Sequence, residues 1–265
     1  MEFMKSPEVW SAVIALLALV LSQLPPVHQL LRRRALHIVI PEYLSLYHFL
    51  GNLNLLGFVA LHNTGGKTLT VAKIDCIVTS DSAVWHLPGL MYQSRQSQGG
   101  GGQQNLEFFV EWSVLKPDEH WSETVHFFKP WTVQEEEDAA EIISKIRSNI
   151  NAKIAQRPAD APKIPVEADD EFVREAKEFF LKRFQLVKGN YRIVIAALSE
   201  KKEVLALRSF DFTLFDNHIK TLRSATDDYK LGAGVYYAAD PSKQVPIRLR
   251  PISDADARQE YLKAY

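Results

Sequence analysis

An uncharged apolar block near the N-terminus constrains this chain more than any other feature. Residues 9–24 read VWSAVIALLALVLSQL, with only three polar positions. Apolar side chains would cover the whole circumference of such a helix, which is typical of a segment that lies in lipid. Sixteen helical residues span about 24 Å, less than the ~30 Å hydrocarbon core of a bilayer. A helix that continued through the following pair of prolines to Leu31 would be long enough to cross.

Residues 1–34 are therefore predicted to form an N-terminal membrane anchor with a basic flank. The residues assigned to the anchor and its flank are Trp10, Leu16, Leu17, Leu19, Leu21, Arg32, Arg33 and Arg34. Two alternatives are a cleaved signal peptide, which would need a more basic leader and a small-residue cleavage site, and a buried core helix, which would need a one-sided apolar stripe. The proline pair either kinks or ends the helix.

The orientation of the anchor follows from the basic residues on its two sides. One lysine precedes the block, whereas three consecutive arginines follow it. The positive-inside rule places the arginines in the cytoplasm. The prediction is a single-pass protein of the inner or plasma membrane with a cytoplasmic C-terminal body; a periplasmic or extracellular body is the alternative. The lone Cys76 fits a reducing compartment and excludes an internal disulfide.

The charge of the body argues against nucleic acid as a partner. Of 31 basic and 32 acidic residues, four basic and two acidic ones precede Ala35, so residues 35–265 have a formal charge of about −3. A general nucleic-acid binder would show a basic excess. The chain is 46% hydrophobic, which is enough for a substantial core.

Alternating apolar residues predict that the body is rich in β-strands. Ile74, Cys76 and Val78 share one face of a strand at residues 67–80, with Asp75 on the other face. Further strands are expected at residues 53–62, 105–115, 121–128, 191–198, 204–214 and 245–249. The turn from Asn63 to Gly66 predicts a hairpin, and this strand–turn–strand segment resembles immunoglobulin-like sandwiches in general architecture. The expected fold is mainly β with an α insert: an antiparallel β-sandwich that follows the transmembrane helix.

Two helices are expected to form an αα-hairpin inserted at about residues 132–189. Thr132 and Glu135 match a capping box, and Gly189 is expected at the C-terminal end of the second helix. An isoleucine at every fourth position gives the first helix one apolar stripe. The hairpin either packs on the sandwich or binds a partner. The residues assigned to possible partner contact are Gln98, Gly100 and Gln103 in the 93–105 loop, and Ile146 and Ile150 on the stripe.

No pattern identifies a catalytic residue, a cofactor-binding residue or a metal ligand. The glycine run at residues 99–102 lacks the lysine of a phosphate-binding loop. The Gly232–Ala–Gly234 segment lacks the third glycine of a dinucleotide site. His120 and His126 lie about 20 Å apart if both are in one strand, too far to share an ion, and are expected at the surface. Acidic pairs at residues 227–228 and 254–256 fit turns better than catalysis.

These observations predict a membrane-anchored, non-enzymatic binding or scaffolding module that presents a β-sandwich to the cytoplasm. Its expected partners are the lipid bilayer and either a different protein or a second copy of the same chain. One alternative is an oligomerising membrane effector whose soluble domain senses a ligand, because polar residues interrupt the apolar block. Another is an enzyme of unfamiliar type, which would require carboxylates that gather in a cleft.

Overall fold

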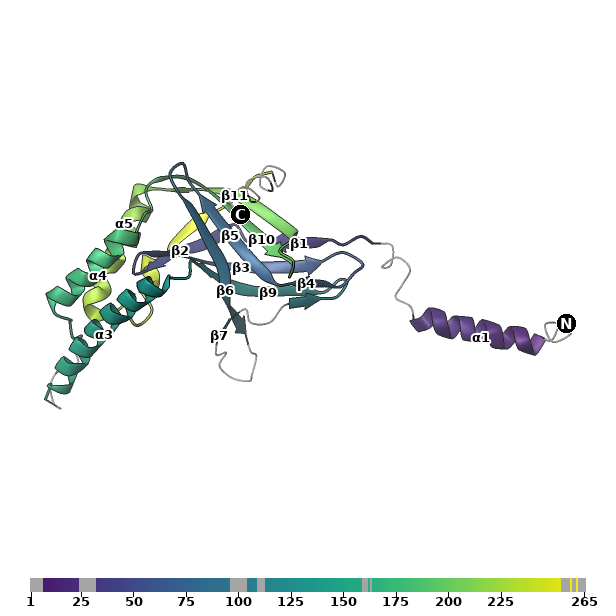
Figure 1. The fold of residues 1–265 in the computed structure, drawn as a ribbon, viewed down its shortest axis with the longest axis horizontal. Helices are drawn as coiled ribbons and strands as arrows, with labels where there is room; N and C mark the ends of the chain where they lie inside the picture. Colours follow the sequence, from purple (N-terminus) through teal and green to yellow (C-terminus); the bar gives the residue numbers. More distant parts are fainter. Residues whose placement is uncertain are drawn as a thin grey trace.

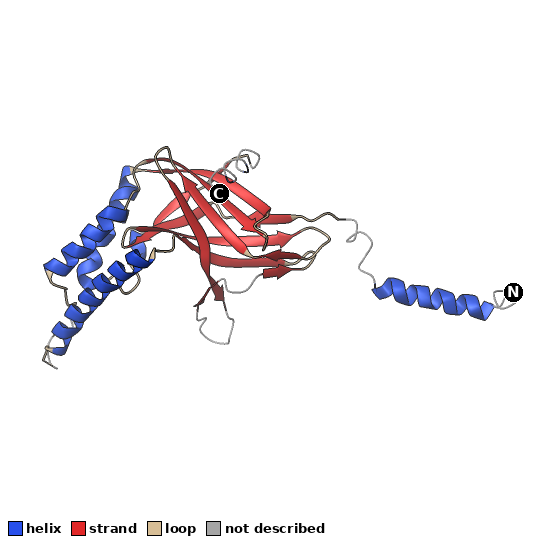
Figure 2. Ribbon diagram, in the orientation of Figure 1, coloured by secondary structure: helices blue, strands red, loops and turns tan. Residues whose placement is uncertain are grey.

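The computed structural model describes residues 7–23, 32–95, 104–108, 113–158, 162, 164–253, 258 and 261. Antiparallel strands form most of the body, and three α-helices lie at one end of it (Figures 1 and 2). The expected β-rich body with a helical insert is therefore confirmed, and its sheet curls into a partly barrel-like shape. The remaining described helix, α1, lies beyond the opposite end (Figure 1).

The elements follow the chain in the order β-strands, helical insert, β-strands. The strands are β1 (Leu36–Val39), β2 (Tyr43–Phe49), β3 (Asn52–Asn63), β4 (Leu69–Val71), β5 (Lys73–Thr79), β6 (Val84–Arg95), β7 (Gln104–Phe108), β8 (Ser113–Leu115), β9 (His120–Phe128), β10 (Gly189–Leu198), β11 (Val204–Leu214), β12 (Val245–Arg248) and β13 (Arg250–Pro251). The helices are α1 (Pro7–Gln23), α3 (Val133–Ala155), α4 (Asp170–Arg183), α5 (Asp216–Ser224), and the 3₁₀ segments η2 (Ala225–Leu231) and η3 (Pro241–Lys243).

The apolar block forms α1, a helix of 17 residues. Every side chain from Trp10 to Ser22 is exposed, on all sides of the helix. The hydroxyl of Ser22 donates a hydrogen bond to the carbonyl oxygen of Leu19 at 2.7 Å. Among the described helices, none has both the length and the apolar character that a membrane crossing requires. The proposed extension of this helix to Leu31 lies outside the described residues.

One long strand, β6, belongs to both layers of the body. Its first half, residues 84–88, pairs with β5, and its second half pairs with β9 from Gly89 onward. The register shifts between Gly89 and Met91, which is the mark of a bulge and bends the strand. The strand order β12-β2-β3-β9-β6-β5-β10-β11-β13 therefore runs from one layer into the other without a break.

The expected hairpin after β3 is wrong. The strand that follows the Asn63–Gly66 turn, β4, pairs with β8, whereas β3 pairs with β1, β2 and β9. The buried side chain of Asn63 fixes the turn instead: its Nδ2 donates to the carbonyl oxygens of Lys67 and Leu115, and its Oδ1 accepts from the Gly65 amide. A local turn signal indicates that the chain turns here, but it does not indicate which strands pair with each other.

The main core lies between the two layers. It collects the apolar positions of alternating strands, including Leu55, Leu61, Val125, Phe127 and Ile193, each of which is fully buried. Cys76 is also fully buried, as expected, and burial raises the pKa of its thiol well above the usual range. A buried neutral thiol acts as a small apolar side chain.

The helical insert has its own core, and this corrects the prediction of a partner contact on α3. Ile146 is completely buried and Ile150 is 3% exposed. Both pack within a cluster that includes Leu50, Val173, Phe180 and other apolar side chains. The rest of the chain therefore covers the isoleucine stripe from Ile142 to Ile150, whereas Ile154 at its end is exposed.

The capping box at the start of α3 is confirmed, since the Glu135 amide bonds the Thr132 hydroxyl and the Thr132 amide bonds the Glu135 carboxylate. The expected end of the second helix is wrong. Helix α4 ends at Arg183, because Phe184 adopts an extended backbone, and Gly189 begins β10.

The outer face of β5 is buried too, which the alternation of the sequence did not indicate. Asp75 is fully buried beneath Tyr261, whose hydroxyl donates to the Asp75 carboxylate at 3.3 Å. His86 Nε2 lies 2.8 Å from the same carboxylate, and Lys73 Nζ lies 3.2 Å from it. This strand is covered on both faces because Tyr261, near the C-terminus, packs with Ile77 on the outer side of the sheet.

Candidate functional site

Two adjoining cavities lie where the outer face of β2, β3 and β9 meets the helical insert. We call them together the junction cleft. The first has a volume of about 580 Å³ and the second about 560 Å³. Tyr47, Phe49 and His126 line both, so the two cavities share a wall. Volumes of this size match those of small-molecule sites.

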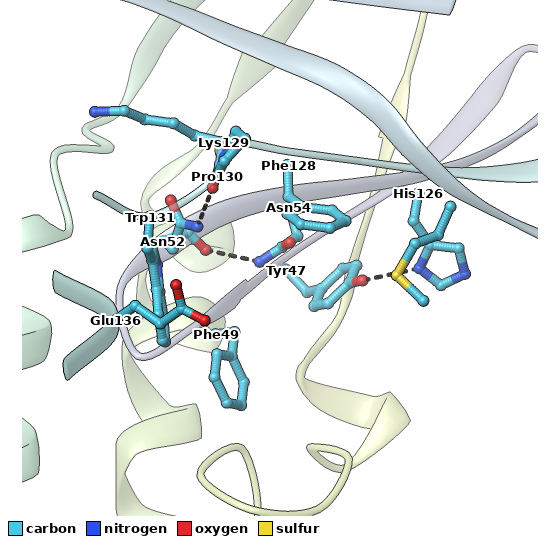
Figure 3. Close-up of a pocket in the computed structure, with 11 residues that line it drawn as sticks. Tyr47, Phe49, Asn52, Asn54, His126, Phe128, Lys129, Pro130, Trp131 and Glu136 are labelled. Carbon is cyan, nitrogen blue, oxygen red and sulfur yellow. Dashed lines mark hydrogen bonds between the residues drawn. The ribbon is translucent and has the colours of Figure 1, made fainter. Parts of the chain in front are cut away.

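Strand alternation places the first group of side chains on this face. In β2, Leu44, Leu46 and His48 are buried, so Tyr47 and Phe49 point to the opposite side. Asn54 of β3 pairs with Tyr47 on one side and with Phe128 of β9 on the other. Figure 3 shows Phe49, Trp131 and Glu136 at one part of the first cavity and Tyr47 with His126 at another.

The polar groups of the first cavity are held by local hydrogen bonds. Asn54 Nδ2 donates to the carbonyl oxygen of Asn52 at 2.8 Å, and Asn52 Nδ2 donates to that of Lys129 at 2.8 Å. The hydroxyl of Tyr47 lies 3.4 Å from Nδ1 of His126. Burial raises the pKa of Tyr47 and lowers the pKa of His126, so both side chains are neutral near pH 7.

Phe49 and Arg183 fix Trp131 in the wall of the first cavity. Its ring stacks on Phe49 with centroids 5.6 Å apart, and the guanidinium of Arg183 lies 5.6 Å from the Trp131 ring. Arg183 forms an ion pair with Glu135 at 2.6 Å, which lowers the pKa of that carboxyl to about 2. Glu135 belongs to the capping box, so the start of α3 and the end of α4 jointly position Trp131.

The second cavity is closed on one side by the loop at residues 232–239. Gly232 has φ of +85°, and a Cβ at this position would lie 2.2 Å from the Tyr236 ring. Only glycine permits both this backbone conformation and this close packing. The hydroxyl of Tyr237 donates to the carbonyl oxygen of Leu231 at 2.8 Å. Gly232 and Gly234, which do not belong to a dinucleotide site, therefore set the conformation of a loop that carries two tyrosines.

Arg147 supplies the formal charge of the second cavity. Its guanidinium lies 5.2 Å from the Tyr236 ring centroid. Among the residues that the structure describes, no aspartate or glutamate lines this cavity. The other two basic residues of α3, Lys145 and Lys153, are each paired with carboxylates, whereas no carboxylate among the described residues pairs with Arg147.

The structure places the basic flank of the anchor at the end of the body opposite the helices (Figure 1). Arg32 pairs with Asp118 at 2.8 Å. The amides of Thr64 and Gly65 donate to the carbonyl oxygen of Ala35, and the Gly66 amide donates to that of Arg33. Backbone hydrogen bonds therefore hold the chain that leaves the anchor against the β3–β4 turn. The junction cleft lies at the far end.

The remaining sequence-predicted positions do not gather into one site. Gln98, Gly100 and Gln103 lie outside the described residues. Trp10, Leu16, Leu17, Leu19 and Leu21 are exposed on α1, and Ile146 and Ile150 are in the helical core. His120 is exposed as expected, whereas His126 is half-buried in the junction cleft, so its expected surface position is wrong.

The acidic pairs do not form a catalytic cluster in the described part of the chain. Asp216 pairs with Lys188 and Asp227 with Lys177, at the surface. No group of three or more His, Cys, Asp or Glu side chains within the described ranges has the arrangement of a metal site. The positions at residues 254–256 lie outside those ranges.

Sequence reasoning missed the aromatic residues of the junction cleft. Tyr47, Phe49, Trp131 and Tyr236 come from four segments that are far apart in the chain. The one local signal was the pair of tyrosines directly after Gly232 and Gly234, where glycine turns mark a loop rather than an element.

Comparisons with known proteins give no relative for this chain. No protein-family model, no curated protein and no solved structure matches it.

Proposed function

We propose that this protein is a membrane-anchored, non-enzymatic binding module that captures a small aromatic ligand in the junction cleft. Residues 1–34 hold it in the inner or plasma membrane, with α1 in the bilayer and the body in the cytoplasm. The body acts in the general manner of immunoglobulin-like sandwiches, which bind through one end. The observation that carries the proposal is the pair of adjoining aromatic-walled cavities at the end remote from the anchor.

The anchoring part of the proposal rests on the exposure of α1. Its large apolar side chains, from Trp10 to Leu21, are 40–63% exposed. Burial of a large apolar side chain contributes about 1.5–3 kcal/mol, so a helix exposed on all sides is costly in water. Lipid covers such a helix on every side at once. The basic flank at Arg32–Arg34 agrees with this location.

The binding part rests on the chemistry of the cleft wall. Aromatic rings with a few fixed polar groups are typical of sites for planar small molecules. The hydrogen bonds of Asn52 and Asn54 and the stack of Phe49 on Trp131 are already formed. A preformed wall lowers the entropy cost of binding.

Flotation with phosphatidylcholine vesicles tests the anchor. The full chain is expected to float with the vesicles, and the double variant Leu17→Glu/Leu21→Glu is expected to remain at the bottom of the gradient. Val114→Glu is the matched control, because Val114 is an exposed apolar side chain of the body; it should float like the parent chain. Protease protection in sealed vesicles then reports the side on which the body lies. A parent chain that stays at the bottom contradicts the proposal.

Binding of a neutral planar probe tests the cleft. Naphthalene-1-sulfonamide is expected to bind the full chain in nanodiscs above the signal from empty nanodiscs. Phe49→Ala should reduce its affinity by at least tenfold, whereas Val84→Ala, at an exposed apolar position that lines neither cavity, should not. Equal binding by both variants would place the probe elsewhere and reject the cleft as the site.

A further inference from the structure

The second cavity of the junction cleft has the charge and wall of a site for an aromatic anion. It is lined by Tyr47, Phe49, Tyr236 and Tyr237, together with the amide side chains of Gln93 and Gln244. Its histidines do not add charge near pH 7, because burial lowers the pKa of His48 to about 4 and lowers that of His126. Arg147 is then the one formal charge among the described residues of the wall.

The surroundings of Arg147 indicate that this charge is available. Helix α3 has no acidic residue three or four positions from Arg147, where a helical ion pair would form. Lys145 has two carboxylate partners, Glu141 and Glu175, and Lys153 has Asp169. The guanidinium of Arg147 lies over the Tyr236 ring instead, which leaves its N–H groups for an acceptor. A guanidinium binds carboxylate, sulfonate and phosphate oxygens through paired hydrogen bonds.

Positive-φ glycines, backbone hydrogen bonds and a ring contact define the conformation of the loop that holds Tyr236. Gly232 and Gly234 both have positive φ, the Tyr236 amide bonds the carbonyl oxygen of Gly232, and the Gly234 amide bonds that of Tyr237. The Tyr236 and Tyr237 rings contact edge to face at 5.2 Å. Two aromatic rings and one guanidinium are thus fixed on the same wall.

We infer that the second cavity binds a planar aromatic group that carries an anionic substituent, with the substituent on Arg147 and the ring against Tyr236 and Phe49. Mononucleotides and simple aryl acids share this chemistry. The inference rests on the proposed function, because it specifies the ligand of the same cleft. In this arrangement the aromatic rings bind the aromatic group of the ligand, and Arg147 favours anionic over neutral ligands.

Matched pairs of probes test the inference on the full chain in nanodiscs, with empty nanodiscs as background. Naphthalene-1-sulfonate is compared with neutral naphthalene-1-sulfonamide, and adenosine 5′-monophosphate with adenosine, by calorimetry. In at least one pair the anion is expected to bind tenfold or more tightly than the neutral partner. The pair with the higher affinity identifies whether the site prefers aryl acids or nucleotides.

Variants of Arg147 decide whether this residue causes the preference. Arg147→Gln is expected to abolish the preference while the neutral probe still binds, and Arg147→Lys should retain part of it. Arg174→Gln is the matched control, because Arg174 is an exposed arginine of the other long helix, α4, and does not line the cleft; it should bind like the parent chain.

Three outcomes reject the inference. Equal affinity for both members of each pair overturns the charge discrimination and leaves the proposed function standing. An unchanged preference in Arg147→Gln shows that another group holds the anion. No binding of any probe to the parent chain overturns both the inference and the proposed function.

Discussion

The imidazole Nε2 of His48 lies 2.8 Å from the carbonyl oxygen of Leu222 and joins the β2–β3 hairpin to α5. A carbonyl oxygen only accepts, so Nε2 carries the proton. The other ring nitrogen, Nδ1, accepts the Gly51 amide at 3.3 Å and is therefore unprotonated. The neutral ring uses both of its nitrogens, and it packs against Phe180 and Phe184. Burial accordingly lowers the pKa of His48 to about 4.

The stability of the protein is expected to fall on mild acidification because of His48. The folded-state pKa of about 4 lies below the ordinary value near 6.5, so the unfolded chain takes up the proton first. The free energy of unfolding is at its full value above about pH 6.5 and decreases towards pH 4, by up to about 3 kcal/mol. Urea unfolding at pH 7.5 and pH 5 should show about 2 kcal/mol of this loss.

A variant separates His48 from the other titrating groups. His48→Gln removes the titration, so the difference between pH 7.5 and pH 5 should shrink in that variant. His37→Gln changes an exposed histidine and should keep the parent's difference. The same pH dependence in His48→Gln and the parent chain would show that another group is responsible.

Tyr229 is predicted to tolerate the loss of its hydroxyl. Its side chain is completely buried in the helical core, and the hydroxyl has no hydrogen-bond partner among the described residues. Burial raises the pKa of Tyr229 above its ordinary value. An unpaired buried polar group costs about 1–3 kcal/mol. Tyr229→Phe should therefore raise the free energy of unfolding by about 1 kcal/mol, measured by urea unfolding; a loss of that size would reveal a partner for the hydroxyl.

Gly51 is predicted to be essential to the contact between the β2–β3 hairpin and α4. Its φ is +87°, and an added Cβ would lie 2.7 Å from the carbonyl oxygen of Phe180. Gly51→Ala should lower the free energy of unfolding by about 2–3 kcal/mol through backbone strain and this clash. Gly189→Ala is the control, because Gly189 also has positive φ but a Cβ there meets nothing within 4 Å. A smaller loss in Gly51→Ala than in the control would contradict the close approach.

The Glu135–Arg183 ion pair is predicted to matter more than an exposed pair. Glu135→Gln keeps the cap, since glutamine also serves in a capping box, but loses the charge facing Arg183. The expected loss is about 1 kcal/mol, whereas Glu141→Gln, which weakens an exposed helical pair with Lys145, should cost less than about 0.5 kcal/mol. The melting temperatures of the Glu135→Gln and Glu141→Gln variants, each compared with that of the parent chain, test this prediction.

The Glu135–Arg183 ion pair is also expected to make stability depend on pH, in a lower pH range than His48 does. The pKa of Glu135 is lowered to about 2, so its contribution is present above about pH 4.5 and is lost as the pH falls towards 2. Glu135→Gln should flatten the stability profile in that range. An unchanged profile in the variant would exclude Glu135 as the titrating group.

Features encoded by neighbouring residues could be predicted from the sequence. The capping box of Thr132 and Glu135 and the core position of Cys76 depend on short-range periodicity, and the structure has both. Gly189 begins a strand and does not end a helix, because a glycine signals a turn but does not indicate whether a helix or a strand adjoins it.

Features that depend on which segments become neighbours could not be predicted. Alternation assigned Asp75 to an open face, yet Tyr261, from the far end of the chain, covers it. The junction cleft likewise combines β2, β9, α3 and the 232–239 loop. Period-2 patterns identify the two faces of a strand but not what packs on each face, so neither arrangement has a local signature.

The pairing of β5 with β10 has a consequence for synthesis on the ribosome. Residues 80–188 separate the two strands in the chain, and they include the whole αα-hairpin. Long-range pairing of this kind is slow because a large loop must close first. The β5 edge beside Asp75 and Ile77 therefore stays open until β10 has been translated, long after the apolar N-terminal segment has emerged. During that interval the nascent chain exposes an apolar strand edge, so chaperone protection should matter most before residue 198 is made.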